Sequence, residues 1–271
     1  MKHVFFSFVL AASLVSAAQL EMLEPVHKFI DNGQTVDLGV VGPGQKIVVI
    51  ANRPSGELSR NTAGAREALW DKLLVDTLPS GWKSEDSKLY ENPFQAFVTV
   101  GPETADGDYQ FTLKTLNEYD GIPALSVQAT LRVSKDVMGF SVKNSKASTG
   151  VGQPGVFFLT LKNTGSASDV YELTPSGIPA GWGTKRRLFV PHNSEINVAY
   201  EVLPEEHGEY VLNFRAESLS NPRIFKMQTA TLKTETSVWN DLKASANGVL
   251  LFPTVQQSAY ALLSLVAQWL R

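Results

Sequence analysis

An internal repeat restricts the folds open to this chain of 271 residues more than any other feature of its sequence. The segment Leu78–Trp82 has the form Leu-Pro-x-Gly-Trp, and Ile178–Trp182 repeats it as Ile-Pro-x-Gly-Trp. Two further matches follow in the same order and at nearly the same offset, Gly107–Tyr109 with Gly208–Tyr210 and Ala129–Arg132 with Ala230–Lys233. Three ordered matches at nearly constant spacing indicate two tandem copies of one domain.

The signature of this repeat consists of Pro79, Gly81, Trp82 and Tyr109 in the first copy, and of Pro179, Gly181, Trp182 and Tyr210 in the second. Each tryptophan follows a Pro-x-Gly turn and admits two interpretations: an exposed platform that stacks on a sugar ring, or a side chain that covers the end of a core. A large aromatic side chain buries roughly 150–250 Å², which matters to a small core. Because the tryptophan recurs in both copies, we predict a structural role, with Trp82 and Trp182 mostly buried.

The strand signals of both copies are short. In Phe94–Val100, for example, apolar side chains alternate, and turn-forming residues separate this run from the next, Tyr109–Leu116. Neither copy contains a long helical pattern, so the chain is predicted to be all-β, with two tandem β-sandwiches. We place the first domain at residues 19–135 and the second at 136–237, joined almost directly through the short polar segment Ser134–Asp136.

The first copy contains an insertion that the second lacks. Between the positions aligned at Asn52 and Trp70 the first copy is longer, so the extra residues lie in a loop at 53–69. Within it, Ala63–Leu69 has the composition of one or two helical turns. Loops tolerate additions at little thermodynamic cost and often carry binding residues. We expect a surface excursion, either without a dedicated task or with a role in binding.

A family resemblance rests on three consecutive features of the second copy. A strand ends in Leu161–Ser166 with the sequence Leu-Lys-Asn-Thr-Gly-Ser, the turn Pro179–Trp182 follows, and Gly208–Tyr210 opens a later strand. This order resembles the NEW3 type of immunoglobulin-like domain, found on archaeal and bacterial surface proteins. The resemblance covers residues 138–236 well and residues 24–133 less well. It implies a non-catalytic β-sandwich outside the cytoplasm and no specific ligand, since one fold hosts many roles.

Composition argues against several functional classes. A formal net charge of -3 and the lack of a visible basic face do not suggest nucleic-acid binding. The absence of cysteine excludes disulfides, thiolate zinc sites and cysteine nucleophiles. The four histidines are scattered, and the sequence contains no zinc, P-loop, dinucleotide or nucleophile-elbow motif. We therefore expect no enzyme activity, no cofactor and no bound metal.

Three charged segments remain as candidate sites. The acidic turns 103–108 and 205–209 lie at equivalent places in the two copies, but neither has the ligand spacing of an EF-hand calcium loop. We expect them to be solvated hairpins that protect a sheet edge. The basic run Lys185–Arg187 has no counterpart in the first copy. It suits an acidic partner or lipid head groups, although three basic residues on a turn are usually only solvated.

The two ends of the chain have the character of membrane signals. Residues 1–18 combine one lysine, an apolar run and small residues, which predicts a secretory signal peptide, with an uncleaved anchor as the alternative. Beyond a linker at 238–248, residues 249–271 are uncharged except for Arg271. A helix of this length spans about 30 Å of hydrocarbon, which predicts a single membrane span with Arg271 on the cytoplasmic side.

A polar stripe runs along the expected tail helix and consists of Gln257, Ser264 and Gln268. A polar stripe in a membrane span often faces another helix, so these residues are candidate contacts with a partner helix. The same stripe also fits an amphipathic helix that docks on the protein or lies in the membrane plane.

These observations favour a membrane-anchored, non-enzymatic protein outside the cytoplasm, whose immunoglobulin-like domains serve envelope scaffolding, adhesion or protein–protein interaction. The expected partners are the membrane and a protein or cell-envelope component, with no nucleic acid. The alternative is an accessory binding subunit of a carbohydrate-active or translocation-associated membrane complex, in which the polar stripe packs against a partner helix.

Truncation of the chain after Asn247 tests the tail. If residues 249–271 span the membrane, the full chain fractionates with membranes and the truncated chain becomes soluble, because the apolar run no longer partitions into hydrocarbon. Fractionation followed by immunoblotting measures the outcome. Recovery of both chains in the soluble fraction after signal cleavage would show that the tail is a docking helix.

Overall fold

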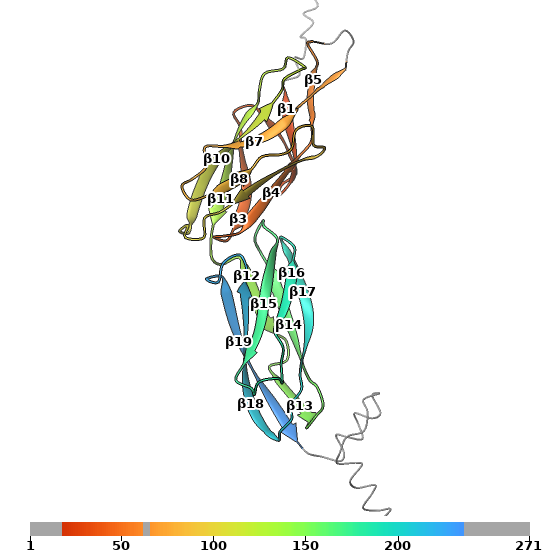
Figure 1. The fold of residues 1–271 in the computed structure, drawn as a ribbon, viewed down its shortest axis with the longest axis vertical. Coiled ribbons are helices and arrows are strands. Elements are labelled where there is room, and N and C mark those ends of the chain that lie inside the picture. The colour runs from red at the N-terminus through yellow and green to blue at the C-terminus, as the bar shows by residue number, and fades with distance from the viewer. Residues whose placement is uncertain (1–17, 62–65, 236–271) are drawn as a thin grey trace, which may run out of the picture.

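The computed structural model of the chain describes residues 18–61 and 66–235. They form two β-sandwiches joined end to end into one elongated body (Figure 1). No helix in these two ranges is long and apolar enough to cross a bilayer. Outside the described residues lie the predicted signal peptide up to residue 17, the linker at 238–248, and the tail helix with Gln257, Ser264 and Gln268.

The strands of the first domain are β1 (Gln19–Glu24), β2 (Lys28–Asp31), β3 (Thr35–Val41), β4 (Lys46–Ala51), β5 (Pro54–Leu58), β6 (Glu67–Leu69), β7 (Lys72–Asp76), β8 (Lys83–Glu85), β9 (Phe94–Thr99), β10 (Gly107–Leu116) and β11 (Ser126–Val133). Those of the second domain are β12 (Met138–Val142), β13 (Lys146–Gly150), β14 (Gly155–Asn163), β15 (Asp169–Ser176), β16 (Arg186–Val190), β17 (Ser194–Val202), β18 (Gly208–Ser218) and β19 (Phe225–Glu235). The all-β prediction is confirmed for the described residues.

Each domain packs two sheets face to face. In the first domain, a sheet of order β2-β1-β4-β9-β8 covers one of order β3-β11-β10-β7. In the second, β12-β14-β17 covers β13-β19-β18-β15-β16. Both domains pair an early strand parallel with their last strand, β3 with β11 and β13 with β19. If β1, β4, β7, β8, β9, β10 and β11 are lettered A to G, one sheet of the first domain contains A-B-E-D and the other C-F-G, with β2 and β3 as additional edge strands. This is the strand arrangement of an immunoglobulin-like sandwich.

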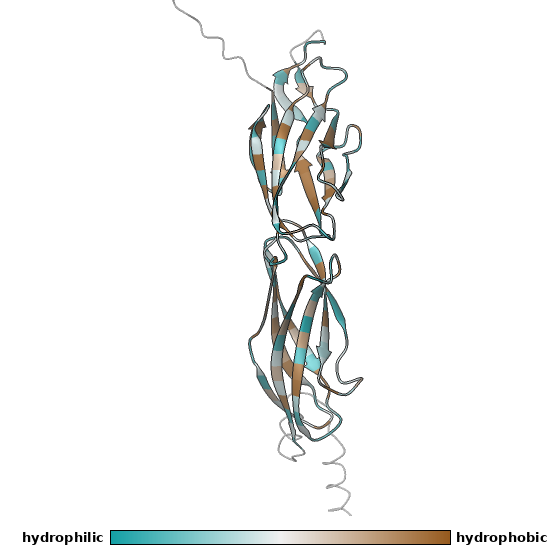
Figure 2. Cartoon of the chain, turned by 90° about the vertical axis from the view of Figure 1, so that its left-hand side faces the viewer, coloured by the Kyte–Doolittle hydropathy of each residue, from teal (hydrophilic) through white to brown (hydrophobic). Residues whose placement is uncertain are grey.

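Alternating side chains build a separate core in each sandwich. Every second residue of β9 and β11 is buried, and Figure 2 shows apolar and polar bands alternating along the strands. The largest fully buried side chains include Trp70, Phe94 and Phe111 in the first core and Phe157, Tyr171, Tyr200 and Phe214 in the second. Each domain therefore has an apolar core of its own, as expected for domains of about 100 residues.

The insertion of the first copy is a β-hairpin. The prediction of helical turns at Ala63–Leu69 is wrong for Glu67–Leu69. These residues form β6, which pairs with β5. Ala68 is fully buried in the first core, and the Ser55 hydroxyl donates to the Ala68 carbonyl at 2.7 Å. These tertiary contacts outweigh the weak helical preference of an alanine-rich segment.

The two copies differ in which sheet receives the segment after the Pro-x-Gly-Trp turn. In the first copy β8 pairs with β9, whereas in the second β16 pairs with β15. Side chains already occupy the edge of β7 in the first copy: the Val75 N–H donates to Asp86 at 3.0 Å, and the Leu73 N–H donates to Ser87 at 2.8 Å. Because these side chains satisfy the edge, β7 has fewer N–H groups left for another strand.

A buried hydrogen-bond network joins the two domains. Gln45 of the first domain is fully buried, and its amide donates to the Asp169 carboxylate of the second domain at 2.7 Å. The Ser218 and Ser220 hydroxyls donate to the same carboxylate at 2.5 and 2.8 Å. The Gln45 side-chain carbonyl in turn accepts the Gly42 N–H at 2.7 Å. Since a buried carboxylate is costly without such donors, the network favours one orientation of the domains.

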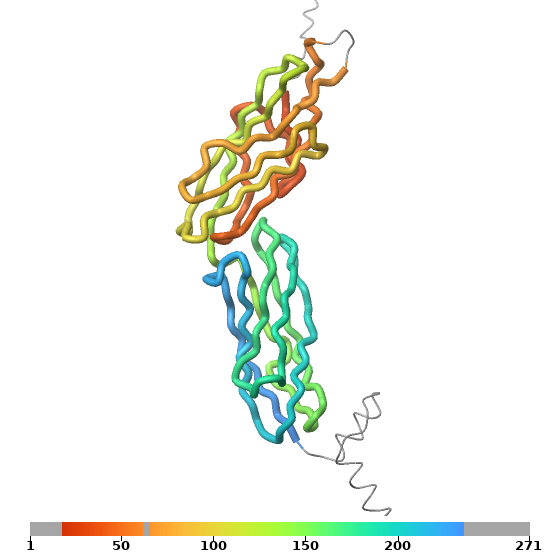
Figure 3. The backbone as a smooth tube through the Cα atoms, viewed as in Figure 1, coloured from red at the N-terminus to blue at the C-terminus, as the bar shows by residue number. Residues whose placement is uncertain are grey.

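A β-bulge in β3 adds apolar packing to this joint, at the waist where the chain passes from one domain to the other (Figure 3). The register of β3 against β11 shifts between Asp37 and Val40, with Gly39 at a φ of 89°. The Val40 carbonyl accepts the Ser166 N–H at 2.6 Å, and its side chain packs on the second core. A side chain at Gly39 would strike the Ser166 hydroxyl. Ala167 of the second domain is buried in the first core, so the two cores meet at the joint.

Asp169→Ala tests this joint by removing the acceptor that Gln45, Ser218 and Ser220 share. We expect a fall in stability on the order of 1–3 kcal/mol and loss of the single domain orientation, because buried donors lose their partner. Thermal melting measures the first effect, and small-angle X-ray scattering measures the second as a broader range of interdomain distances. Asp76→Ala, which removes an exposed carboxylate of the first domain that pairs with Lys114, is the control. An unchanged scattering profile for Asp169→Ala would show that the joint does not depend on this residue.

Candidate functional site

The signature turns have the same geometry in both sandwiches. Gly81 and Gly181 have φ values of 81° and 95°, a left-handed conformation that suits glycine. The N–H of Trp82 and that of Trp182 donate to the proline carbonyl of their own turn at 3.2 and 3.4 Å. Trp82 is 7% exposed and Trp182 is 3% exposed. Neither ring therefore offers a flat face on which a sugar could stack.

Each tryptophan packs on the tyrosine of its signature. The ring centroids of Trp82 and Tyr109 are 5.4 Å apart, and those of Trp182 and Tyr210 are 4.7 Å apart. The Tyr109 hydroxyl donates to the Ala105 carbonyl at 3.0 Å, which is the tyrosine corner of immunoglobulin-like sandwiches. These contacts place the signature residues in the framework of the fold, so a binding surface has to be sought elsewhere.

The three side chains of the basic segment Lys185–Arg187 all bind partners within the chain. Lys185 and Arg187 bind the Glu172 carboxylate at 3.0 and 3.2 Å, and these two bonds lower the pKa of Glu172. Arg186 donates to the Ala199 carbonyl at 3.0 Å. In the described part of the chain, acidic turns included, no group of His, Asp or Glu side chains is arranged to hold a metal ion.

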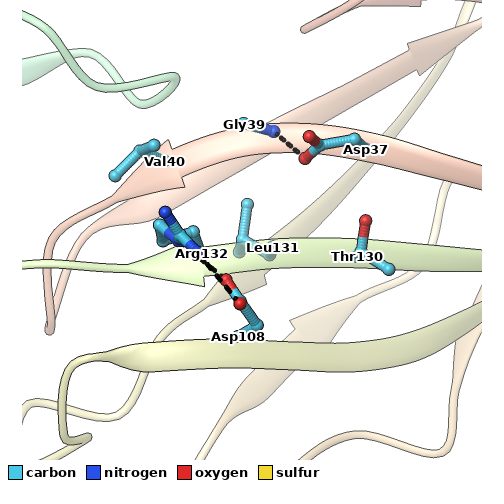
Figure 4. A pocket seen from close by; sticks show the side chains of 7 residues that line it. All are labelled: Asp37, Gly39, Val40, Asp108, Thr130, Leu131 and Arg132. Atoms are coloured by element: carbon cyan, nitrogen blue, oxygen red, sulfur yellow. Dashed lines mark hydrogen bonds and ion pairs between the residues drawn. The ribbon is translucent and has the colours of Figure 1, made fainter.

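A hollow of about 480 Å³ beside β3 and β11 is lined by charged side chains that already have partners within the chain (Figure 4). Arg132 binds Asp108 through two bonds of 2.8 and 3.1 Å, and this pair lowers the pKa of Asp108. Asp37 accepts the Gly39 N–H at 2.9 Å. The hollow lies at the bulge that builds the joint, and we attribute it to that bulge and not to a ligand.

The strongest candidate is the distal loop end of the first domain, opposite the joint (Figure 1). The β5–β6 hairpin meets the loop after β10 there, and buried Asp120 joins the two. Its carboxylate accepts the Ser59 hydroxyl at 2.6 Å, the Leu69 N–H at 3.0 Å and the Arg66 guanidinium at 2.5 Å. These groups, the Ser59 hydroxyl foremost, lower the pKa of Asp120 from its ordinary 3.8. The hairpin is therefore held in place by a buried, ionised carboxylate.

Two tyrosines lie exposed on this loop end. Tyr119 is 63% exposed and Tyr90 is 42% exposed, with ring centroids 6.5 Å apart. The Arg53 guanidinium lies 5.5 Å from the centroid of the Tyr90 ring. A hydrogen bond with the Tyr119 side chain raises the pKa of Tyr90 to about 12. Tyrosine and arginine are the side chains that most often dominate binding energy in protein interfaces.

Tyr90 adopts a strained backbone conformation. Its φ of 59° lies in the left-handed region, which costs a non-glycine residue on the order of 1–3 kcal/mol. Its N–H donates to the Asp71 carbonyl at 2.7 Å, which helps to hold this conformation. Strain of this kind concentrates at functional sites. The neighbouring Leu89 is also exposed, and we name Leu89, Tyr90 and Tyr119 the tip surface.

In the second domain the equivalent loop end is not free for a partner, because it contacts the first domain at the joint. There the Ser166 N–H binds the Val40 carbonyl, and the Asn221 amide donates to the Pro102 carbonyl at 2.8 Å. Arg223 adds an ion pair of 2.6 Å with Glu103, which places one acidic turn at the joint.

Sequence patterns missed the tip surface. Tyr90 and Tyr119 lie in loops that match no motif and take no part in the repeat. The insertion at 53–69 was the available signal, since it marked this end of the first copy as different from the second. The contact of its hairpin with Asp120 needed the tertiary structure.

Comparisons with known proteins name no family. No protein-family model matches the chain, and no curated protein sequence matches it. Among solved structures it is similar to a chimeric titin Z1Z2 carrying a decorin peptide, at 16% identity over 82% of this chain and 100% of that one, with a TM-score of 0.36.

Two further structures are the Yersinia pseudotuberculosis adhesin InvE and a Listeria innocua β-glucosidase. The adhesin is 14% identical over 73% of this chain and 56% of its own, with a TM-score of 0.28. The glucosidase is 9% identical over 37% of this chain and 16% of its own, with a TM-score of 0.26. TM-scores this low support no functional argument, so the immunoglobulin-like assignment rests on the strand order and the NEW3 resemblance gains no support from a family match.

Asp120→Ala tests the support of the tip surface. We expect a loss of stability on the order of 1–3 kcal/mol and faster proteolysis within residues 53–69, because the Leu69 N–H and the Ser59 hydroxyl lose a buried acceptor. Timed digestion with mass spectrometry locates the cut, and Asp76→Ala, at an exposed ion pair of the same domain, is the control.

The pH dependence of the hairpin follows from the lowered pKa of Asp120. The stabilisation is present at neutral pH and is lost as the pH falls through the folded-state pKa, which lies below 3.8. The Leu69 amide resonance, followed by NMR, should titrate there in the wild type and not in Asp120→Asn. Equal digestion of the wild type and Asp120→Ala, or no titration of Leu69, would contradict this role.

Proposed function

We propose that this chain is a non-enzymatic interaction protein, a pair of fixed immunoglobulin-like domains that presents its tip surface to a protein partner. One observation carries the proposal: exposed Tyr90 and Tyr119 sit on loops with fixed supports, the buried Asp120 carboxylate beside Tyr119 and the hydrogen bond from the Tyr90 N–H to the Asp71 carbonyl. Tyrosine supplies a large contact area at a low cost in conformational entropy. A surface organised before binding also loses less freedom on association.

The joint supports the same proposal, because it sets the tip surface at a constant distance from the other end of the body. The loops lie at one end, and β19 ends with Glu235 at the opposite end (Figure 1). A partner bound at the tip surface is thus held two domains away from whatever the C-terminal end contacts.

We further propose that residues 1–18 direct secretion and that residues 249–271 anchor the body in a membrane, with Arg271 in the cytoplasm. The support is the uncharged run of the tail and the charge at its end. In this arrangement the domains lie outside the cytoplasm and the tip surface points away from the membrane. Scaffolding of the cell envelope and adhesion both fit that placement.

Photo-crosslinking in the producing cells tests the interaction. A photoreactive phenylalanine analogue replaces Tyr119 in the full chain, and after irradiation the adducts are resolved by electrophoresis and identified by mass spectrometry. We expect one discrete, protease-sensitive adduct, because the side chain at this position is exposed and the next residue, buried Asp120, fixes the loop.

The matched control carries the same analogue at Phe158, an exposed aromatic side chain of the second domain. No adduct at position 119, or the same adducts at both positions, would overturn the assignment of the tip surface. A protease-resistant adduct would exclude a protein partner.

A further inference from the structure

A second exposed surface lies on the side of the second domain, on the outer face of the sheet that contains β16, β15, β18 and β19 (Figure 1). Its large apolar side chains are between 42% and 61% exposed. Monomeric soluble proteins rarely expose contiguous apolar patches larger than a few hundred Å², and larger ones mark interaction sites. The lateral face, as we name it, consists of Phe189, Leu219, Phe225 and Met227 together with Arg215 and Glu217.

Strand register brings the centre of this face together. Arg215 pairs with Met227, and Glu217 pairs with Phe225 at the next outward-facing step of the β18–β19 ladder. The Arg215 guanidinium lies 4.1 Å from the centroid of the Phe225 ring and binds Glu217 at 2.7 Å. Aromatic, methionine and arginine side chains are the types enriched in protein interfaces.

The face continues toward β16. Phe189 lies opposite Val170, and the Leu219 N–H binds the Val170 carbonyl at 2.9 Å. Next to this row Arg187 binds Glu172. Arg187 and, on β18, Arg215 are thus paired with carboxylates of the same face. A phosphate or an anionic membrane is therefore not the expected ligand, since binding either one needs unpaired basic groups.

The first domain shows that the fold does not require these apolar residues. At the step where Arg215 pairs with Met227, the first domain pairs Lys114 with Ser126. Lys114 binds Asp76 at 2.5 Å, so the equivalent position is polar. The apolar side chains therefore point to a use that belongs to the second domain.

The pattern of the face is complementary to itself. In a two-fold symmetric contact, if residue i meets residue j, then j meets i. An axis that crosses β18 and β19 midway between the two register steps sets Arg215 opposite Glu217 of the partner subunit. The same axis sets Met227 opposite Phe225 of the partner subunit. We propose that the lateral face binds a second copy of this chain in this antiparallel arrangement.

Charge exchange across the axis provides the test, with sedimentation velocity of the full chain in mild detergent as the measurement. The wild type self-associates. Arg215→Glu raises the Kd about tenfold or more, because two like charges meet at each half of the contact. Adding Glu217→Arg to Arg215→Glu recovers most of the affinity, since the exchanged charges pair again across the axis.

The repeat offers matched controls for this test. Lys114→Glu makes the same charge change at the corresponding position of the first domain and leaves the Kd unchanged. Met227→Ser, which introduces the residue type of the first copy, raises the Kd. Unchanged melting temperatures show that each variant is folded. Association through the tail alone would leave every variant equal to the wild type and would overturn the proposal.

A photoreactive residue at Met227 identifies what covers the face. Crosslinks between the lateral faces of two copies support the proposal. Crosslinks to residues 236–271 of the same chain, or to a different protein, would assign the face to another occupant and overturn it. A wild type that stays monomeric at every accessible concentration would do the same.

Discussion

The Asp169 carboxylate, buried between the two domains, is the group on which the arrangement of the whole body depends. It accepts hydrogen bonds from Gln45 across the joint and from Ser218 and Ser220 within its own domain. Domains of one chain usually move against each other, because their interfaces are small and polar. Here, bending the domains apart would break the buried hydrogen bond from the Gln45 amide to the Asp169 carboxylate, which leaves the amide N–H without its acceptor. The apolar contacts of Val40 and Ala167 with the opposite cores act in the same direction.

The joint also explains how two copies of one domain come to have different tasks. In the second copy the loops that face the first domain are buried against it, through residues such as Ser166 and Asn221. In the first copy the equivalent end carries a hairpin that Asp120 holds against the loop after β10. One end of the sandwich thus serves as an internal joint in one copy and as a free surface in the other. The framework residues, such as Trp82 and Trp182, do not change between the two uses.

The sheet faces diverge in the same manner. The step that holds Lys114 and Ser126 in the first domain holds Arg215 and Met227 in the second, with identical strand register. Outward-facing positions of a strand can change without disturbing the core, because the side chains alternate between the two faces of the sheet. A repeat therefore permits one copy to keep a polar face while the other carries an apolar surface for association.

The sequence alone determined the repeat, the all-β class and the turns, because each follows from contacts between near neighbours along the chain. Alternation in Phe94–Val100 is a property of one strand, and the Pro-x-Gly-Trp turn closes on itself. Only the tertiary structure decided the rest. Gln45 lies in a glycine-rich turn that looks solvent-exposed, yet its partner, Asp169, is 124 residues away.

The positions of Ala68 and of the two tyrosines of the tip surface also depend on contacts between residues that are far apart in the chain. An alanine-rich stretch has a helical preference, but burial of Ala68 beside Ser55 makes it part of a strand. Nothing next to Tyr90 or Tyr119 in the chain indicates that the two rings meet. Local free energies of a few tenths of a kcal/mol per residue set propensity, whereas burial and hydrogen bonding between distant segments contribute on the order of 1 kcal/mol or more per group. Where the two disagree, the distant contacts prevail, and a sequence read along its length does not contain them.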